Sequence, residues 1–197
     1  MALFGLSRIL EPEPRLSGAG LVLRPAMASD YVAWAALREQ SRAFLTPWEP
    51  TWPEDDLNRP AFRRRLRRQS EEIGRDESYP FLIFEEATGT LFGGITLGGL
   101  RRGVAQSATL GYWMGAPHSG KGVMTRAVGV VGRFGFGSLR LHRIEAGCLP
   151  ENMASRALLE KNGFQREGLA REYLKINGAW RDHLLYALID HEASRLV

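Results

Sequence analysis

Apolar residues recur every three to four positions over residues 123–134 of the chain. The repeating positions are Val123, Ala127, Val130, Val131 and Phe134. This spacing is typical of a helix that buries one face. Residues 109–114, just before it, are rich in β-branched and aromatic side chains, which favours a strand. A glycine-rich segment at 115–122 separates the two, so the pattern predicts a strand, a tight turn and a buried helix in succession.

The pattern predicts further strands and helices along the rest of the chain. Proline and glutamate near the start indicate an extended N-terminal arm over residues 1–17. A helix capped by Ser29 or Asp30 follows. Its predicted buried face consists of Val32, Ala36 and Leu37. The other predicted elements are strands at 20–25, 79–85, 91–97, 105–114, 141–146, 164–175 and 182–190, helices at 54–74 and 150–162, and a hairpin turn at Asn177-Gly178. No repeat or linker divides them, which predicts a single domain over residues 1–197.

The glycine-rich segment predicts a phosphate site, because backbone N–H groups at a helix start are free to bind an anion. Gly115, Gly120 and Lys121 nearly satisfy the P-loop rule, but Gly122 has no hydroxyl for a magnesium ion. A dinucleotide fingerprint fails as well, because Thr125 stands where its third glycine belongs. The segment therefore predicts a pyrophosphate site without a metal, and the four histidines of the chain show no metal-ligand spacing.

A second segment, residues 150–164, is predicted to present polar groups beside that site. Proline and glutamate open its helix, and Asn162-Gly163 end it with residues that tolerate positive φ. Asn152 and Ser155 stand three positions apart, so an amide and a hydroxyl are expected on the same face. The alternative is that they form only a helix cap and a solvent-facing hydroxyl.

These two segments resemble the GNAT superfamily of acyl-CoA-dependent N-acetyltransferases, whose pyrophosphate loop follows the pattern Gln/Arg-x-x-Gly-x-Gly/Ala. Gly120 and Gly122 match its glycines, and Pro117 replaces the polar first residue. Over about residues 18–190 the chain is similar to the branch that acetylates ribosomal-protein N-termini. The similar stretches are 141–145, 150–152, 160–164, 166–168 and 177–182. The resemblance implies an α/β (α+β) fold, with a mixed, largely antiparallel sheet of six or seven strands and about four flanking helices.

The resemblance also implies acetyl-CoA as co-substrate and no metal. Asn152 matches the residue that holds the CoA arm, and Ser155 the residue that protonates the thiolate. Main-chain N–H groups near Trp113 and Met114 are expected to bind the thioester oxygen, by analogy with the fold. The cofactor-binding residues implied are Trp113, Met114, His118, Ser119, Gly120, Lys121, Gly122, Val123, Asn152 and Ser155.

The acceptor amine must be neutral to attack a thioester. Deprotonating a lysine at neutral pH costs roughly 4 kcal/mol, against about 1 kcal/mol for an α-amino group, so an α-amine needs only a modest base. Glu172 is the expected base, acting through a water, because the ribosomal-protein branch carries a glutamate in a similar stretch. Glu145 is the alternative base, and a strand glutamate is also commonly just solvated or paired.

Composition is that of an ordinary soluble enzyme, with 44% hydrophobic and 24% charged residues in 197. One cysteine, Cys148, and no apolar run of membrane-spanning length predict a cytoplasmic location and a buried, unreactive thiol. Five arginines at residues 63–68 could grip RNA or the ribosome, or could spread over a solvated helix face next to acidic residues. Net charge is only +4, which favours the solvated face.

The sequence therefore predicts an acetyl-CoA-dependent N-acetyltransferase that modifies the N-terminal α-amine of a protein, such as a ribosomal protein, in a ternary complex. One alternative is an acetyltransferase of a small amine, such as a polyamine or an aminoglycoside. An alternative of another class is a non-catalytic module that senses CoA or binds RNA or the ribosome. The sequence leaves the oligomeric state open between monomer and dimer.

Overall fold

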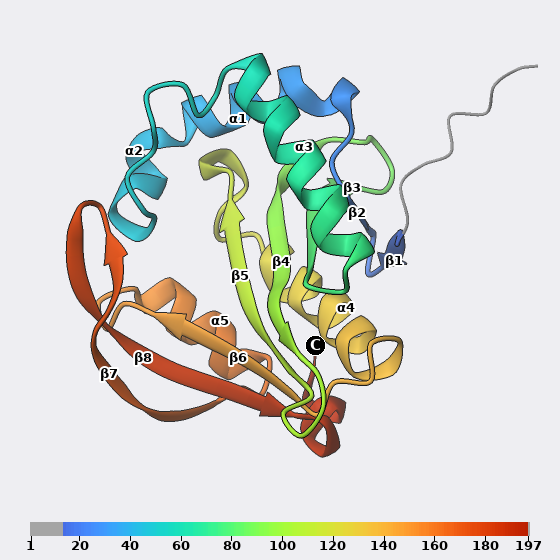
Figure 1. The fold of residues 1–197 in the computed structure, drawn as a ribbon, viewed down its shortest axis with the longest axis vertical. Coiled ribbons are helices and arrows are strands. Elements are labelled where there is room, and N and C mark those ends of the chain that lie inside the picture. The colour runs from blue at the N-terminus through green and yellow to red at the C-terminus, as the bar shows by residue number, and fades with distance from the viewer. Residues whose placement is uncertain (1–13, 197) are drawn as a thin grey trace, which may run out of the picture.

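The structure is a computed structural model that describes residues 14–196. These residues form one eight-stranded sheet in the order β1-β2-β3-β4-β5-β6-β8-β7 (Figure 1). The strands are β1 Leu16–Gly18, β2 Leu21–Arg24, β3 Ser78–Glu85, β4 Leu91–Arg101, β5 Ser107–Met114, β6 Arg143–Cys148, β7 Gln165–Ile176 and β8 Ala179–Ile189. Only the β5–β6 pair is parallel within this sheet. The predicted mixed, largely antiparallel fold is confirmed.

Helices cover both faces of the sheet. The five in the described part of the chain are α1 Tyr31–Gln40, α2 Arg42–Leu45, α3 Arg59–Gly74, α4 Val123–Gly137 and α5 Met153–Lys161. Figure 1 shows α3 in front of the sheet and α4 and α5 behind it. Two buried apolar clusters follow from this arrangement, a large one between the sheet and α4 and a smaller one against α1 and α3. Within residues 14–196, no helix is long and apolar enough to cross a membrane.

Helix α4 matches its predicted pattern. Val123, Ala127, Val130 and Val131 are buried, and Phe134 packs partly buried against the same cluster. A 3.6-residue repeat placed against the sheet buries such a stripe. The helix therefore anchors the glycine turn that precedes it.

The predicted buried face of α1 is partly wrong. Leu37 is buried as expected, but Val32 is 67% exposed and Ala36 is also exposed. Trp34 occupies the core instead, with its ring 4.8 Å from that of Phe62 on α3. Because small apolar residues lie all around this helix, several of its faces could be buried. The large side chain of Trp34 determines which face packs against the core.

The predicted count of six or seven strands is too low, and the strand that the sequence missed is β1, which lies at the end of the predicted arm. Gly18 pairs with Leu21, so Ala19 and Gly20 form a two-residue hairpin loop, with φ of 54° and 73°. Such a loop requires positive φ at both positions, and an alanine there is not a turn signal. Residues 1–13 of the arm lie outside the described residues.

The predicted helix at 54–74 begins later than expected, at Arg59. Asn58 caps it, since its side chain accepts a hydrogen bond of 2.8 Å from the N–H of Ala61. The short helix α2 at Arg42–Leu45 had no separate signal in the sequence. The hairpin turn at Asn177-Gly178 is confirmed, because β7 ends at Ile176 and β8 begins at Ala179.

The sheet splits between its two parallel strands. Residues 107–109 of β5 pair with residues 143–145 of β6, and the pairing stops there. Beyond that point β5 continues to Met114 along β4, while β6 continues to Cys148 along β8. The sheet therefore opens toward the turn before α4 and the start of α5, which is where both predicted site segments lie.

Candidate active site

The glycine turn before α4 has the geometry of an anion site. Gly120 and Gly122 have φ of 74° and 71°, which glycine adopts without strain. Gly122 occupies the N-cap position without a side-chain hydrogen bond, and the first helical bond runs from the Arg126 N–H to its carbonyl at 3.2 Å. The preceding N–H groups of the helix have no partner inside the helix. A Cβ at either glycine would meet open space, so the turn leaves these amides room for a pyrophosphate.

The other residues of the turn differ in what they can offer a ligand. Val123 is buried in the core, so only its main chain can face the turn. The His118 ring lies 4.8 Å from the Phe92 ring, and burial and the nearby Lys121 charge lower its pKa. A neutral imidazole at pH 7 adds no positive charge there. Ser119 and Lys121 are both exposed and stay available to an anion.

Trp113 and Met114 lie on the part of β5 that faces the split. Trp113 pairs with Gly94 of β4, and a Cβ on Gly94 would come within 2.4 Å of the Trp113 Nε1. The indole therefore uses the space that the missing side chain leaves. Because this part of β5 pairs with β4 on one edge only, its other main-chain edge is open to a ligand in the described sheet.

Asn152 and Ser155 are brought together at the start of α5, but not as predicted. The helix begins at Met153, and the Asn152 side chain caps it by accepting a 3.0 Å hydrogen bond from the Ser155 N–H. The predicted helix start at 150 is wrong, because Asn152 is the N-cap; its predicted contact with CoA stays a prediction. Ser155 is not solvent-facing, since only 9% of it is exposed.

The hydroxyl of Ser155 contacts a residue that the sequence did not single out. Its Oγ lies 2.5 Å from the Tyr112 hydroxyl, across the gap between β5 and α5. Burial raises the pKa of Tyr112, so this phenol stays protonated at neutral pH and can donate to Ser155. The alternation of β5 was the available signal, because Tyr112 must face the side opposite to Trp113.

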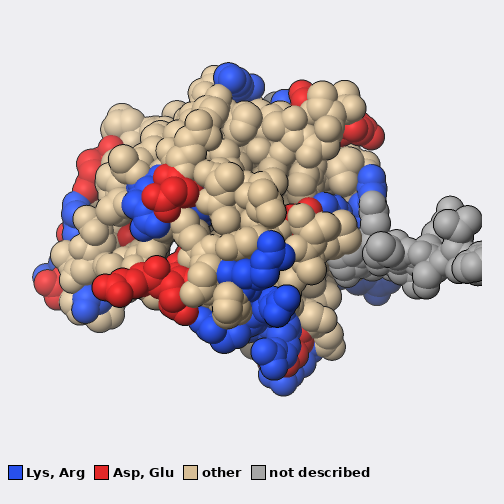
Figure 2. Space-filling view, turned by 90° about the horizontal axis from the view of Figure 1, so that it is seen from above, with Lys and Arg blue, Asp and Glu red and all other residues tan. Residues whose placement is uncertain are grey.

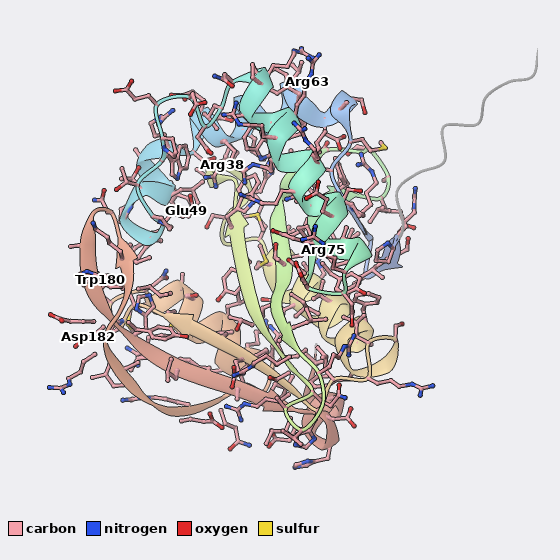
Figure 3. All side chains as sticks on the ribbon, in the orientation of Figure 1. Arg38, Glu49, Arg63, Arg75, Trp180 and Asp182 are labelled. Carbon is pink, nitrogen blue, oxygen red and sulfur yellow. The ribbon has the colours of Figure 1, made fainter. Side chains whose placement is uncertain are left out.

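Glu172 lies in an irregular stretch of β7, with φ of 47°. Its N–H donates to the Asp182 Oδ1 at 2.8 Å. It lines an open pocket of about 340 Å³. The walls of this pocket are Pro150, Glu151, Glu172, Trp180, Arg181 and Asp182, and Figure 3 shows Trp180 and Asp182 on the β7–β8 hairpin. Ser155 is not one of these wall residues, so the two predicted catalytic residues do not share this pocket.

Glu145, the alternative base, is engaged in ion pairs. One carboxylate oxygen accepts from Arg101 at 2.5 Å and the other from Arg143 at 2.9 Å. Glu145 also lies in the paired part of β5 and β6, before the sheet splits. Its position and its partners indicate a structural role.

A buried arginine joins two loops beside the split. Arg38 is 7% exposed and pairs with both carboxylate oxygens of Glu49, at 2.8 and 2.7 Å (Figure 3). Its guanidinium lies over the rings of Trp52 and Trp113, at 4.0 and 4.8 Å. The Glu49 carbonyl accepts from the Asn177 N–H at 2.9 Å, which ties this loop to the β7–β8 turn.

The arginines of residues 63–68 form a surface patch on α3 (Figure 2). Arg64 pairs with Asp55 at 2.7 Å, and Arg65 pairs with Asp56 at 2.9 Å. Arg68 is 3.5 Å from Glu72, and Arg63, Arg64, Arg67 and Arg68 are all exposed. Acidic neighbours thus offset much of the patch, which favours the solvated-face interpretation.

Cys148 is buried, and burial raises the pKa of its thiol to about 11. A thiol with this pKa is almost fully protonated at neutral pH and is a poor nucleophile. In the part of the chain that the structure describes, no group of three His, Cys, Asp or Glu side chains is arranged to hold a metal.

Comparison with known proteins agrees with this geometry. The sequence profile of the acetyltransferase (GNAT) domain matches residues 20–165. A Bacillus subtilis (strain 168) protein named "Probable N-acetyltransferase YjcK" is 37% identical over 175 residues, covering 89% of this chain and 97% of the relative. The ribosomal protein uS5-alanine N-acetyltransferase of Escherichia coli (strain K12) is 34% identical over 179 residues, covering 90% and 91%. The solved structure of Mycobacterium smegmatis RimJ in complex with CoA-disulfide has a TM-score of 0.84 and 35% identity, covering 93% of this chain and 91% of that one.

A split mixed sheet with a glycine turn at a helix start defines a class of acyl-CoA-dependent transferases, and the family match fixes the class. This chain belongs to the GNAT acetyltransferase family. The predictions that it is an N-acetyltransferase and that acetyl-CoA is its co-substrate are confirmed at this level. The predicted similarity to ribosomal-protein N-acetyltransferases is confirmed as well.

Proposed function

We propose that this acetyltransferase modifies the N-terminal α-amine of a protein, such as a ribosomal protein. The observation that carries the proposal is the 34% identity, over 90% of the chain, to an enzyme named for acetylating the alanine of ribosomal protein uS5. Similarity over nearly the whole chain includes the acceptor side of the fold as well as the cofactor side. Association with the ribosome is part of the same proposal.

The turn residues 118–123 would hold the pyrophosphate of acetyl-CoA, mainly through main-chain N–H groups at the start of α4. The open main-chain edge of β5 at Trp113 and Met114 would bind the CoA arm and the thioester oxygen. Asn152 would contribute its amide N–H groups to the CoA arm, because its side-chain oxygen caps α5. Acetyl-CoA supplies the activated acetyl group.

The reaction needs two proton transfers on opposite sides of the acyl carbon. The acceptor nitrogen forms its bond to that carbon as the carbon–sulfur bond breaks, and the ammonium proton passes through a water to Glu172. Ser155 gives its proton to the departing sulfur and is in hydrogen-bond contact with Tyr112. Glu172 is favoured over Glu145, because both oxygens of Glu145 are held by arginines.

An α-amine suits a site with one carboxylate base. A lysine would cost roughly 3 kcal/mol more to deprotonate at neutral pH. The small-amine alternative draws support from the pocket beside Glu172, because Glu151 and Asp182 also line it and carboxylates attract cations. The binding-module alternative draws little support from α3, whose arginines are largely offset. We also propose a single domain over residues 1–197 and a cytoplasmic location, in keeping with one continuous sheet and one buried cysteine.

The test is a direct comparison of acceptors. Purified protein is incubated with acetyl-CoA and one of four acceptors: a peptide beginning with Ala or Ser, the same peptide with a blocked N-terminus and internal lysines, spermidine, or an aminoglycoside. Release of CoA and mass spectrometry of the product identify the acetylated nitrogen. Acetylation only of the free N-terminus is the expected result. Acetyl groups only on lysine side chains or on the small amines would contradict the proposal and leave the family assignment intact.

A further inference from the structure

The stretch of β7 that carries Glu172 is held by a single residue of the neighbouring strand. Ala170 pairs with His183 and Leu174 pairs with Arg181, so residues 171–173 lie opposite Asp182 alone. Three residues on one strand thus face one residue on the other. This is a β-bulge larger than the common kind with two residues against one, and it removes regular ladder hydrogen bonds from the bulged strand.

The bulge places Glu172 in an unusual backbone conformation. Its φ of 47° lies in the left-handed region, which a residue with a Cβ rarely adopts. Glycine would fit this position without strain, yet the chain carries a glutamate. A strained position of this kind persists only when the surrounding structure holds it, and such positions cluster at functional sites.

Asp182 supplies that support through its side chain. Its Oδ1 accepts the Glu172 N–H at 2.8 Å, in place of a ladder partner for that amide. Both residues also line the pocket of about 340 Å³ near the turn end of the hairpin. The same aspartate, labelled in Figure 3, therefore satisfies the amide of the bulge and lines the same pocket as Glu172.

We propose that Asp182 is a positioning residue, which fixes the bulge so that the Glu172 carboxylate faces the acceptor amine. This inference rests on the proposed function, in which Glu172 accepts the amine proton through a water. Asp182 takes no proton in the reaction and acts only through the backbone of Glu172. Asp182 thus orients the Glu172 carboxylate toward the acceptor amine, so that the amine can lose its proton as it attacks the thioester.

Four variants test the proposal: Asp182→Ala, Asp182→Asn, Glu172→Gln and the double variant Glu172→Gln/Asp182→Ala. Asp182→Ala removes the acceptor of the Glu172 N–H and is expected to lower kcat about 10- to 100-fold, with the KM for acetyl-CoA unchanged. Asp182→Asn keeps an oxygen at the same position and is expected to retain most of the activity. Because Asp182 acts through Glu172, the double variant should be no slower than Glu172→Gln alone.

The pH profile separates positioning from a loss of folding. The defects of Asp182→Ala and Glu172→Gln should both shrink as pH rises, because a larger share of the acceptor is then already neutral. Glu167→Ala is the matched control, since it removes another paired carboxylate from β7, one bound to Arg143 away from the pocket. Its kcat should equal that of the parent at every pH.

The outcomes are distinct for the two proposals. If Glu172→Gln is impaired and Asp182→Ala matches the parent across the pH range, the positioning role is wrong and the base role stands. If Glu172→Gln is fully active, the base role of Glu172 and the positioning role of Asp182 are both wrong. Asparagine has nearly the same shape as aspartate and differs from it mainly in charge. Asp182→Asn therefore remains informative even where Asp182→Ala folds poorly. A defect in Asp182→Asn as large as that of Glu172→Gln would mean that Asp182 acts as a carboxylate itself, which also overturns the positioning role.

Discussion

Tyr112 and Ser155 form the hydroxyl pair with the clearest chemical consequence. Ser155 is held on two sides, since its N–H donates to the capping Asn152 and its Oγ contacts Tyr112. A serine hydroxyl is a weak acid, and a donor hydrogen bond from a neighbour eases the loss of its proton. The raised pKa of Tyr112 keeps that donor protonated at the pH at which the enzyme is expected to work.

Replacing Tyr112 with phenylalanine should therefore slow the chemical step without changing packing. The lost hydrogen bond is worth about 1 kcal/mol, so kcat is expected to fall about fivefold, and Ser155→Ala should cost more. Steady-state release of CoA with the peptide acceptor measures the effect. Tyr79→Phe is the control. Its hydroxyl donates to Asp76, in the turn between α3 and β3, and not to any proposed site residue. An unchanged kcat in Tyr112→Phe would remove the phenol from the mechanism.

Predictions for single residues succeeded where a residue type has one dominant structural role, as glycine has in turns with positive φ. Glycines with positive φ at 120 and 122 belong to this class. For Asn152 the sequence does not choose between uses, because a capping asparagine and a ligand-binding asparagine look the same; the structure shows the cap, and the CoA-arm role stays a prediction. Tyr112 and Asp182 were missed for another reason. Their partners, Ser155 and Glu172, are 43 and 10 positions away, so only the folded chain brings them together.

At the scale of elements, the turn before α4 and the helix itself are expected to act as one unit. The turn exposes main-chain N–H groups, and the helix fixes their direction by burying its apolar face. No side chain packs against Gly120 or Gly122. The backbone conformation therefore favours glycine at both positions, and the proposed approach of the pyrophosphate can be tested there.

Gly122→Ala should weaken binding of CoA about tenfold or more and lower the stability of the fold by about 1 kcal/mol, because alanine is strained at a φ of 71°. Isothermal titration calorimetry and thermal unfolding measure the two effects. Gly137→Ala is the matched control, since it adds a Cβ with nothing within 4 Å at the other end of the same helix. That control should bind CoA as the parent does. Equal affinity in a folded Gly122→Ala protein would mean that the pyrophosphate lies elsewhere.

The elements that the sequence predicted well have a strong local signal. The apolar repeat of α4 and the Asn177-Gly178 turn are such signals, and both were confirmed. The face of α1 was not, since only contact with Phe62 selects Trp34 over its small neighbours. Strand β1 has three residues and a turn with an alanine at positive φ, so it has no local signature and exists only through its pairing with β2.

At the scale of the whole molecule, several buried neutral groups make the fold sensitive to alkali. Burial raises the pKa of Cys148 to about 11 and that of Tyr79 to about 12, and it raises the pKa of Tyr112 as well. These groups hold their protons more tightly in the folded state than in the unfolded state. Their contribution to stability is therefore complete below the unfolded pKa values and is lost as pH rises toward the folded ones.

The midpoint of urea unfolding should accordingly be lower at about pH 10.5 than at about pH 8. Cys148→Ala should show a smaller drop between the two pH values, since one of the groups that ionise on unfolding is gone. Tyr173→Phe, which removes the hydroxyl of a residue that is 48% exposed, should keep the parent's drop. A midpoint that is the same at both pH values would show that these groups ionise equally well in the folded protein.

The short parallel pairing of β5 and β6 has a mechanical consequence. The two halves of the sheet are joined along residues 107–109 and 143–145, and the ion pairs of Glu145 with Arg101 and Arg143 lie at that closed end. Because strand pairing joins the two halves at one end only, a small rotation there becomes a larger displacement at the opening, which the Tyr112–Ser155 hydrogen bond crosses. The separation of Trp113 from the start of α5, where the acyl group would react, thus depends on residues at the join as well as on the Tyr112–Ser155 contact across the opening. Glu145 is therefore expected to influence the proposed reaction through the angle between the two halves of the sheet.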